Sequence, residues 1–179
     1  MEQLPLLLCD NVDFIRLCQL DRHCSGSFDP GHFPRLAASP GLERLCGPIG
    51  YELHFGVDLQ GLHVLEGRLS AACELTCQRC CTGFPAQLTA ELHLSCDERR
   101  AQRLRLTAAY DFFELDARRC CCLRDLLEDS LMLEIPLVPR HPGECPGTEL
   151  QRVSTADGQP PQGGGPWAAL EALRRRDRS

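Results

Sequence analysis

The chain has 179 residues, 43% of them hydrophobic, a formal net charge of −6 and thirteen cysteines. This length suits one domain, or one domain with tails, that can bury a core without disulfides. The negative net charge excludes a protein that binds nucleic acid over its whole surface. No apolar stretch approaches the ~20 residues that are needed to cross a bilayer. An odd number of cysteines, adjacent cysteines and no signal-peptide pattern predict reduced thiols and a cytoplasmic location.

The N-terminal part of the chain carries weak structural signals. Residues 4–8 fit a short strand, and Asp10 or Asn11 can cap a following helix because such side chains accept hydrogen bonds from the first turn. Apolar residues at helical spacing within 12–20 support that helix. Residues 25–48 are rich in glycine, proline and serine, which predicts a loop with room for a single helical turn.

Alternation of apolar and polar residues predicts three consecutive strands. It runs through residues 49–57, 69–77 and 88–94. Consecutive strands with short connections form an antiparallel meander, and one polar face per strand is typical of a sheet covered on one side. Cys77 and Cys80 fall at the turn of the second hairpin, where both sulfurs point the same way.

The second half of the chain gives one clear helix. Residues 97–105 fit either a helix or a loop, and alternation over 104–110 predicts a fourth strand. Leucines within 123–131 follow helical spacing, with acidic residues and an arginine on the other side. We expect this amphipathic helix to cover the sheet.

The predicted fold class is therefore α+β, an antiparallel β-sheet meander with a covering amphipathic helix and a flexible C-terminal tail. A single domain spans residues 1–141. Residues 142–166 form a flexible linker, because a segment so rich in glycine and proline cannot pack a core. Residues 167–179 form a short C-terminal helix whose arginine-rich end complements the helix dipole.

Four residues form a constellation with the spacing of a metal site. Cys77 and Cys80 give Cys-x2-Cys, and His141 and Cys145 give His-x3-Cys, with both pairs at turns beside rigid elements. Together they would make a Cys3His zinc site. Alternatively the two pairs never meet and the thiols are small, partly buried groups, or Cys-x-x-Cys is a redox dithiol, although a strand that runs into a helix is absent. Cys81 and residues 120–122 compete as ligands.

The sequence gives little support for catalysis. It has no phosphate-binding loop of the Walker type, no nucleophile elbow and no histidine pair of a zinc protease. Three histidines lie on the predicted polar faces of strands, where we expect exposed side chains: His54, His63 and His93. Three acids lie on the predicted solvated face of the second-half helix: Asp125, Glu128 and Asp129. We expect no enzyme.

All nineteen basic residues are arginines, and they cluster at 99–105, 118–119 and 174–178. Arginine binds phosphate in a bidentate way, so such patches can hold RNA within an acidic protein. The alternative interpretation is a compositional bias of the genome with solvated charge runs.

Three blocks of the sequence carry a resemblance to a known family. They are LEGRLSAACELTCQRCCTGF at 65–84, LRDLLEDSLMLEIPLVPRHPGEC at 123–145 and GPWAALEALR at 165–174. A strand that ends in Cys-x-Arg-Cys, followed by a leucine-rich acidic helix and Pro-x-His, resembles the bacterial YceD family, the large ribosomal RNA subunit accumulation proteins. The motif positions carried over are Gly67, Cys77, Arg79, Cys80, Asp125, Glu128, Pro136, Pro139, His141, Cys145, Trp167 and Leu170. Cys81, the cysteine triplet and Trp167 depart from the usual pattern.

The resemblance implies a non-enzymatic cytoplasmic factor needed for accumulation of the large-subunit (23S) ribosomal RNA in large-subunit biogenesis. Its partner would be that RNA or its ribonucleoprotein precursor, reached directly or through a basic ribosomal protein, and not DNA or a membrane. Candidate contacts with RNA or a partner are Arg79, Arg140, Trp167 and Arg174. The alternative hypothesis is a small binding or sensor module based on zinc or thiols, with Cys77, Cys80, His141 and Cys145 as its metal ligands.

Overall fold

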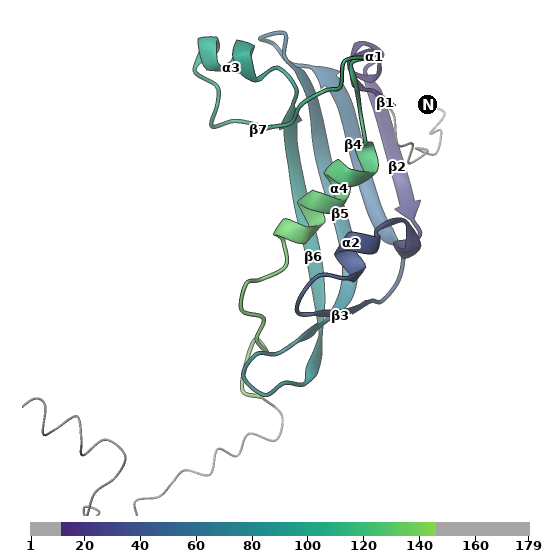
Figure 1. Ribbon diagram of the computed structural model, residues 1–179, viewed down its shortest axis with the longest axis vertical. Helices are drawn as coiled ribbons and strands as arrows, with labels where there is room; N and C mark the ends of the chain where they lie inside the picture. The colour runs from purple at the N-terminus through teal and green to yellow at the C-terminus, as the bar shows by residue number, and fades with distance from the viewer. Residues whose placement is uncertain (1–11, 146–179) are drawn as a thin grey trace, which may run out of the picture. The chain divides into compact units, whose positions relative to one another are not determined.

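The computed structural model describes residues 12–145, and residues 1–11 and 146–179 lie outside that description. One large sheet carries the helices along one side (Figure 1). The elements in chain order are β1 (Val12–Asp13), α1 (Phe14–Gln19), β2 (Arg22–Phe28), the 3-10 helix η1 (Pro30–His32), α2 (Pro34–Ala37), β3 (Leu42–Leu45), β4 (Ile49–Val57), β5 (His63–Thr76), β6 (Gly83–Ser95), α3 (Glu98–Leu104), β7 (Asp111–Phe112), β8 (Cys120–Cys121) and α4 (Leu123–Leu133).

The large sheet has the strand order β2-β4-β5-β6-β7, with β3 paired to β5 off this path. All its pairs are antiparallel except that of β6 with β7. Strands β1 and β8 pair separately. The predicted α+β fold with an antiparallel meander is confirmed, and its centre is the hairpin of β5 and β6.

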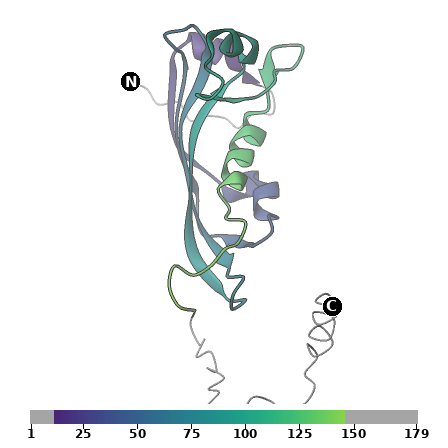
Figure 2. The same ribbon diagram turned by 90° about the vertical axis from the view of Figure 1, so that its left-hand side faces the viewer.

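The sheet has one covered and one bare face. Helices α2 and α4 lie over the covered face, and no described helix lies over the other, which we call the bare face (Figure 2). Because successive strand residues point to opposite faces, alternate residues are buried under the helices. On β4 and β5 these are Ile49, Tyr51, Leu53, Phe55, Leu65, Leu69, Ala71, Cys73 and Leu75.

Helix α4 covers the sheet through a leucine stripe. Leu123, Leu127 and Leu131 are each 0% exposed, and their spacing of four places them on one side of the helix. Full burial of a leucine side chain contributes about 1.5–3 kcal/mol. The predicted amphipathic helix over 123–131 is confirmed.

Glu128 corrects the prediction that the acids of α4 share a solvated face, because its side chain is buried. Its Oε1 accepts hydrogen bonds from the backbone N–H groups of Arg35 (2.6 Å) and Leu36 (2.9 Å), and its Oε2 accepts from Arg35 Nε at 2.9 Å. Phe33, the N-cap of α2, offers no side-chain acceptor. Glu128 therefore caps α2 from the neighbouring helix, a role that becomes visible only when both helices are placed.

Two further predictions about secondary structure are wrong. Residues 25–48, expected to be a loop with room for a single helical turn, do contain the short helix α2, but they also include the end of β2, then η1 and β3. Residues 104–110, expected to be a strand, begin with Leu104, the last residue of α3, and its C-cap Arg105, which adopts the left-handed conformation (φ 60°). Leu106 and Tyr110 then pack on the cluster of Leu62, Val64 and Ala101. Their alternation comes from turns that fold back on this cluster, not from an extended chain.

Several predictions fall outside the described residues: the strand over 4–8, most of the linker over 142–166 and the helix over 167–179. The boundaries of the domain, linker and C-terminal helix therefore stay predictions. Within residues 12–145, no helix combines the length and the hydropathy that a bilayer crossing requires.

Candidate metal centre

The first half of the predicted site lies at the tip of the β5–β6 hairpin. Cys77 N–H donates to Thr82 O at 2.9 Å, and Cys81 N–H donates to Cys77 O at 2.8 Å. These bonds close a tight turn in which Cys81 adopts the left-handed conformation (φ 59°). The backbone N–H of Arg79 points at Cys77 Sγ, 3.4 Å away. The turn thus presents two thiols together with a hydrogen-bond donor for a thiolate.

The second half arrives on the segment that follows α4. Gln78 N–H donates to Pro139 O at 2.9 Å, and Gln78 Nε2 donates to Leu137 O at 3.2 Å. The ring of His141 lies against that of Phe84, with 4.8 Å between the ring centroids. Because prolines keep this segment out of a helix, its carbonyl groups stay free to bind the hairpin tip.

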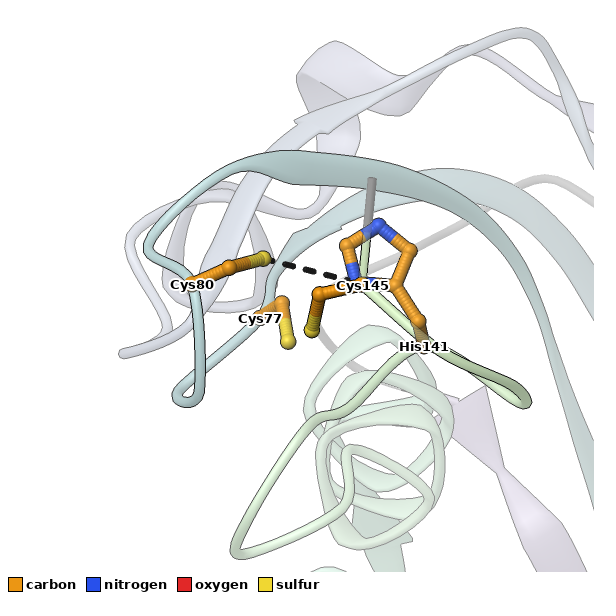
Figure 3. Close-up of side chains that lie close together, drawn as sticks. All are labelled: Cys77, Cys80, His141 and Cys145. Atoms are coloured by element: carbon orange, nitrogen blue, oxygen red, sulfur yellow. Dashed lines mark hydrogen bonds between the residues drawn. The ribbon is translucent and has the colours of Figure 1, made fainter. Parts of the chain in front are cut away.

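The four predicted ligands come together (Figure 3). The ligand atoms of Cys77, Cys80, His141 and Cys145 all lie within 4.8 Å of one another, and Cys80 Sγ lies 3.6 Å from His141 Nδ1. Bonds of ~2.3 Å to sulfur and ~2.1 Å to nitrogen place the ligands of a tetrahedral Cys3His zinc ion about 3.6–3.8 Å apart. A small contraction of this cluster would therefore complete a Cys3His site, so the residues fit zinc. The alternative in which the two pairs never meet is wrong.

The site is sheltered and favours thiolates. Cys77 is 0% exposed and Cys145 is 5% exposed, whereas Cys80 and His141 are partly exposed. Burial raises the pKa of Cys77, but hydrogen bonds from the backbone N–H of Arg79 and from His141 outweigh it and lower the pKa to about 5. A thiol that ionises below neutral pH is ready to bind a metal without a large cost of deprotonation.

The competing cysteines lie elsewhere. Cys81 is exposed and is not part of the cluster. Cys121 lies on β8, and burial raises its pKa to about 12, so it stays protonated. Cys120 and Cys122 also have raised pKa values through burial. Cys77, in the turn of the hairpin, is therefore the thiol with a lowered pKa, in contrast to the cysteines of residues 120–122.

Two of the predicted contact residues flank the cluster. Arg79 is exposed and donates from NH2 to Gly143 O at 2.6 Å. Arg140 is exposed, and no hydrogen bond or ion pair engages its guanidinium within residues 12–145. Trp167 and Arg174 lie outside the described residues.

Sequence reasoning missed the groups that support the ligands. Thr82 Oγ1 lies 3.0 Å from Cys80 Sγ, and Phe84 backs the ring of His141. Thr82 directly follows the cysteines in the turn and Phe84 is the second residue of β6, so their nearness in sequence to a candidate ligand was the available signal. His54 and His63, expected to be exposed, are only 33% and 22% exposed and lie beside Asp21 and Asp97.

Comparison with known proteins gives one family and one informative relative. The YceD family, described as large ribosomal RNA subunit accumulation protein YceD, matches residues 65–174. The chain belongs to the YceD family. A relative from Haemophilus influenzae, named large ribosomal RNA subunit accumulation protein YceD, is 30% identical over 142 residues, which are 79% of this chain and 78% of the relative. No solved structure matches.

Proposed function

We propose that this member of the YceD family is a non-enzymatic cytoplasmic factor that supports accumulation of large-subunit ribosomal RNA. The observation that carries the proposal is the family match, which spans residues 65–174 and includes both halves of the candidate metal centre. The relative from Haemophilus influenzae bears the same description, and the match covers 78% of its length.

The candidate metal centre supports a binding role rather than a catalytic one. With Cys77, Cys80, His141 and Cys145 all bound, a tetrahedral zinc ion has no open position for substrate, which is the pattern of structural zinc sites. Zinc there would join the tip of the hairpin to the segment after α4. These residues would then hold a rigid surface on which Arg79 and Arg140 are presented.

Direct contact with RNA is the favoured route. Arg140 is exposed and unpaired within the described chain, and Arg79 reaches from the same turn as the cysteines. The planar guanidinium of arginine can form two parallel hydrogen bonds with phosphate oxygens. Contacts with phosphates supply most of the affinity for RNA that does not depend on its sequence. Contact through a basic ribosomal protein, which the acidic total charge would favour, is the other outcome of the test.

The primary test is the ratio of large-subunit to small-subunit ribosomal RNA in cells of the source bacterium depleted of the protein. We expect a selective loss of the large-subunit RNA that the wild-type gene restores. The double variant Arg79→Ala, Arg140→Ala should fail to restore it, whereas Arg44→Ala, which removes an arginine paired with Glu74, should succeed. An unchanged ratio after verified depletion would overturn the proposal.

Binding in vitro separates the two routes. If the protein binds RNA alone, the logarithm of its binding constant for RNA should fall linearly with the logarithm of the salt concentration. The double variant should reduce that slope by ~0.7 for each phosphate of single-stranded RNA that it no longer neutralises. Full function in cells without binding to RNA would identify a protein as the direct partner.

A second candidate function is a zinc or thiol sensor. It is favoured by the lowered pKa of Cys77, about 5, together with the partly exposed Cys80 in the same turn, because oxidation of a thiol depends on both thiolate character and exposure. A sensor predicts that Cys77→Ser abolishes function while the fold persists. A structural zinc site predicts that chelation unfolds or loosens the hairpin tip.

A further inference from the structure

A second group of metal-ligand side chains lies on the bare face of the sheet. It consists of Asp21, His23 and His54, which we call the histidine cluster. The register of β2 and β4 pairs His23 directly with His54. Leu53 and Phe55, on either side of His54, are buried under the helices, so His54 itself projects from the opposite face. The cluster is therefore separate from the cysteine centre, which is formed by other elements.

The geometry of the cluster is compact. The rings of His23 and His54 are stacked, with 3.9 Å between centroids and an angle of 5° between their planes. Asp21 Oδ1 lies 2.7 Å from His54 Nε2. All three ligand atoms lie within 4.8 Å of one another. Asp21 adopts the left-handed conformation (φ 48°) just before β2, which turns the chain so that its carboxylate reaches the histidines.

Two imidazoles and one carboxylate form a ligand set suited to zinc and similar divalent transition metals. Zinc bonds of ~2.1 Å at the tetrahedral angle place two ligand atoms about 3.4 Å apart. The Asp21 side chain is 75% exposed, so it can move back from His54 by the small distance that this requires. A metal bound by both imidazoles must also lie in both ring planes, so binding requires one of the stacked rings to turn, which the exposed His23 has room to do. The metal would then replace the proton that the imidazole and the carboxylate now share.

The surroundings favour a cation. Glu52 and Glu66 line the same hollow, of about 460 Å³, as His23 and His54. No hydrogen bond or ion pair engages either carboxylate within the described chain. Arg68 lies opposite Glu52 in the register of β4 and β5, so Glu66 is the carboxylate that adds negative potential beside the histidines. Glu66 pairs with His54 in the register of β4 and β5, and residues directly opposite on one face have Cβ atoms about 5 Å apart.

We propose that Asp21, His23 and His54 bind a divalent transition metal ion such as Zn²⁺ on the bare face of the sheet, with Glu66 as the adjacent carboxylate. Three protein ligands leave a position open to an exogenous oxygen ligand, unlike the cysteine centre, which would be filled by protein. The inference does not depend on the proposed role in RNA accumulation.

The test is a zinc titration of the full chain, followed by NMR of ¹⁵N-labelled histidine rings. In the wild type we expect zinc to shift the ring nitrogens of His23 and His54, whether or not the cysteine centre also holds metal. His54→Ala should weaken binding at this site at least tenfold, and the double variant His23→Ala, His54→Ala should lower the zinc stoichiometry by one. These side chains lie at the surface, so thermal melts in chelator should verify that the variants fold.

A matched control and a second probe complete the experiment. His93 lies on the bare face, opposite Glu66 in the register of β5 and β6, but is not part of the cluster, so His93→Ala should leave the stoichiometry unchanged. Cobalt bound at the histidine cluster should lack the thiolate charge-transfer absorption that a cysteine centre gives. Zinc that leaves the His23 and His54 rings unshifted, or a double variant that binds as much zinc as the wild type, would overturn the inference.

Discussion

The covered and bare faces of the sheet are made by alternate residues of the same strands, yet they serve different purposes. Under α2 and α4 the strands carry leucine, phenylalanine and the buried Cys73. On the bare face they carry histidine, glutamate and arginine, with Arg68 paired to Glu91 at 2.6 Å. Changes on the covered face should therefore cost stability, whereas changes on the bare face should affect mainly binding and cost little stability.

The two candidate metal sites follow the same division. The cysteine centre joins segments about sixty residues apart in sequence and is sheltered, so metal bound there would hold the fold together. The histidine cluster joins neighbouring strands that already pair along their length. Metal bound there would add little to the fold, because the strands need no further link.

Loss of the cysteine centre should have the largest effect on stability. Zinc at about a thousand times its Kd stabilises the folded chain by ~4 kcal/mol, and Cys77→Ser should remove most of that stabilisation. We expect a fall in Tm of about 8–16 °C in the presence of zinc, measured by calorimetry.

Cys81→Ser is the matched control, because Cys81 is adjacent but exposed and lies outside the cluster. It should leave both the zinc content and the Tm as in the wild type. Equal decreases in zinc content and Tm in the two variants would show that Cys77 contributes no more to metal binding than Cys81 does.

Substitution of two glycines, one on each face of the sheet, tests the difference in stability between the faces. A Cβ on Gly67, whose register partner Leu53 is buried, would lie 2.1 Å from the backbone oxygen of Glu52, and its φ of 156° disfavours other residues. Gly67→Ala should therefore destabilise by about 3 kcal/mol in urea unfolding. On the bare face, the atom closest to a Cβ on Gly50 would be the Ser70 hydroxyl oxygen at 3.0 Å, which can rotate away. Gly50→Ala should cost less than about 1 kcal/mol. Equal costs for the two substitutions would contradict the claim that the covered face is the more sensitive one.

Glu128→Ala should have the next largest effect. It removes the acceptor that caps α2 and leaves the backbone N–H groups of Arg35 and Leu36 unpaired, which costs about 2 kcal/mol. Glu128→Gln keeps one acceptor oxygen and should cost roughly half as much. Asp129, whose side chain is 56% exposed, provides the control, and Asp129→Ala should change the free energy of unfolding by less than ~0.5 kcal/mol.

The part of the fold built on strong local patterns could be predicted from sequence. Alternation identified the central strands because each has one buried and one solvated face, and helical spacing identified α4. The cysteine centre could be predicted because Cys77 and Cys80 sit at a turn and His141 follows two prolines, so each pair is held rigidly. In these cases the signal lies within one element or its immediate flanks.

The rest depends on contacts between distant segments. Strand β2 reads RHCSGSF, with small and polar residues that give no alternation, and it is defined by its pairing with β4. The proximity of His23 to His54 follows only from that register. Likewise Glu128 looks like a surface acid until α2 lies beside it. Propensity cannot reveal these roles, because tertiary contacts decide them.

The smallest predicted effect concerns acid stability on the bare face. The hydrogen bond to His54, together with the charges of His54 and His23, lowers the pKa of Asp21 below its ordinary value of 3.8. A carboxyl whose pKa is lower in the folded state contributes stability above pH 3.8, and this is lost as the pH falls through the folded value. Asp21→Asn should therefore slightly reduce the stability measured in urea near neutral pH and should converge on the wild type at lower pH. A variant less stable than the wild type by a constant amount down to the acid limit would show that Asp21 acts through packing, and the bare face would then share the structural role of the covered one.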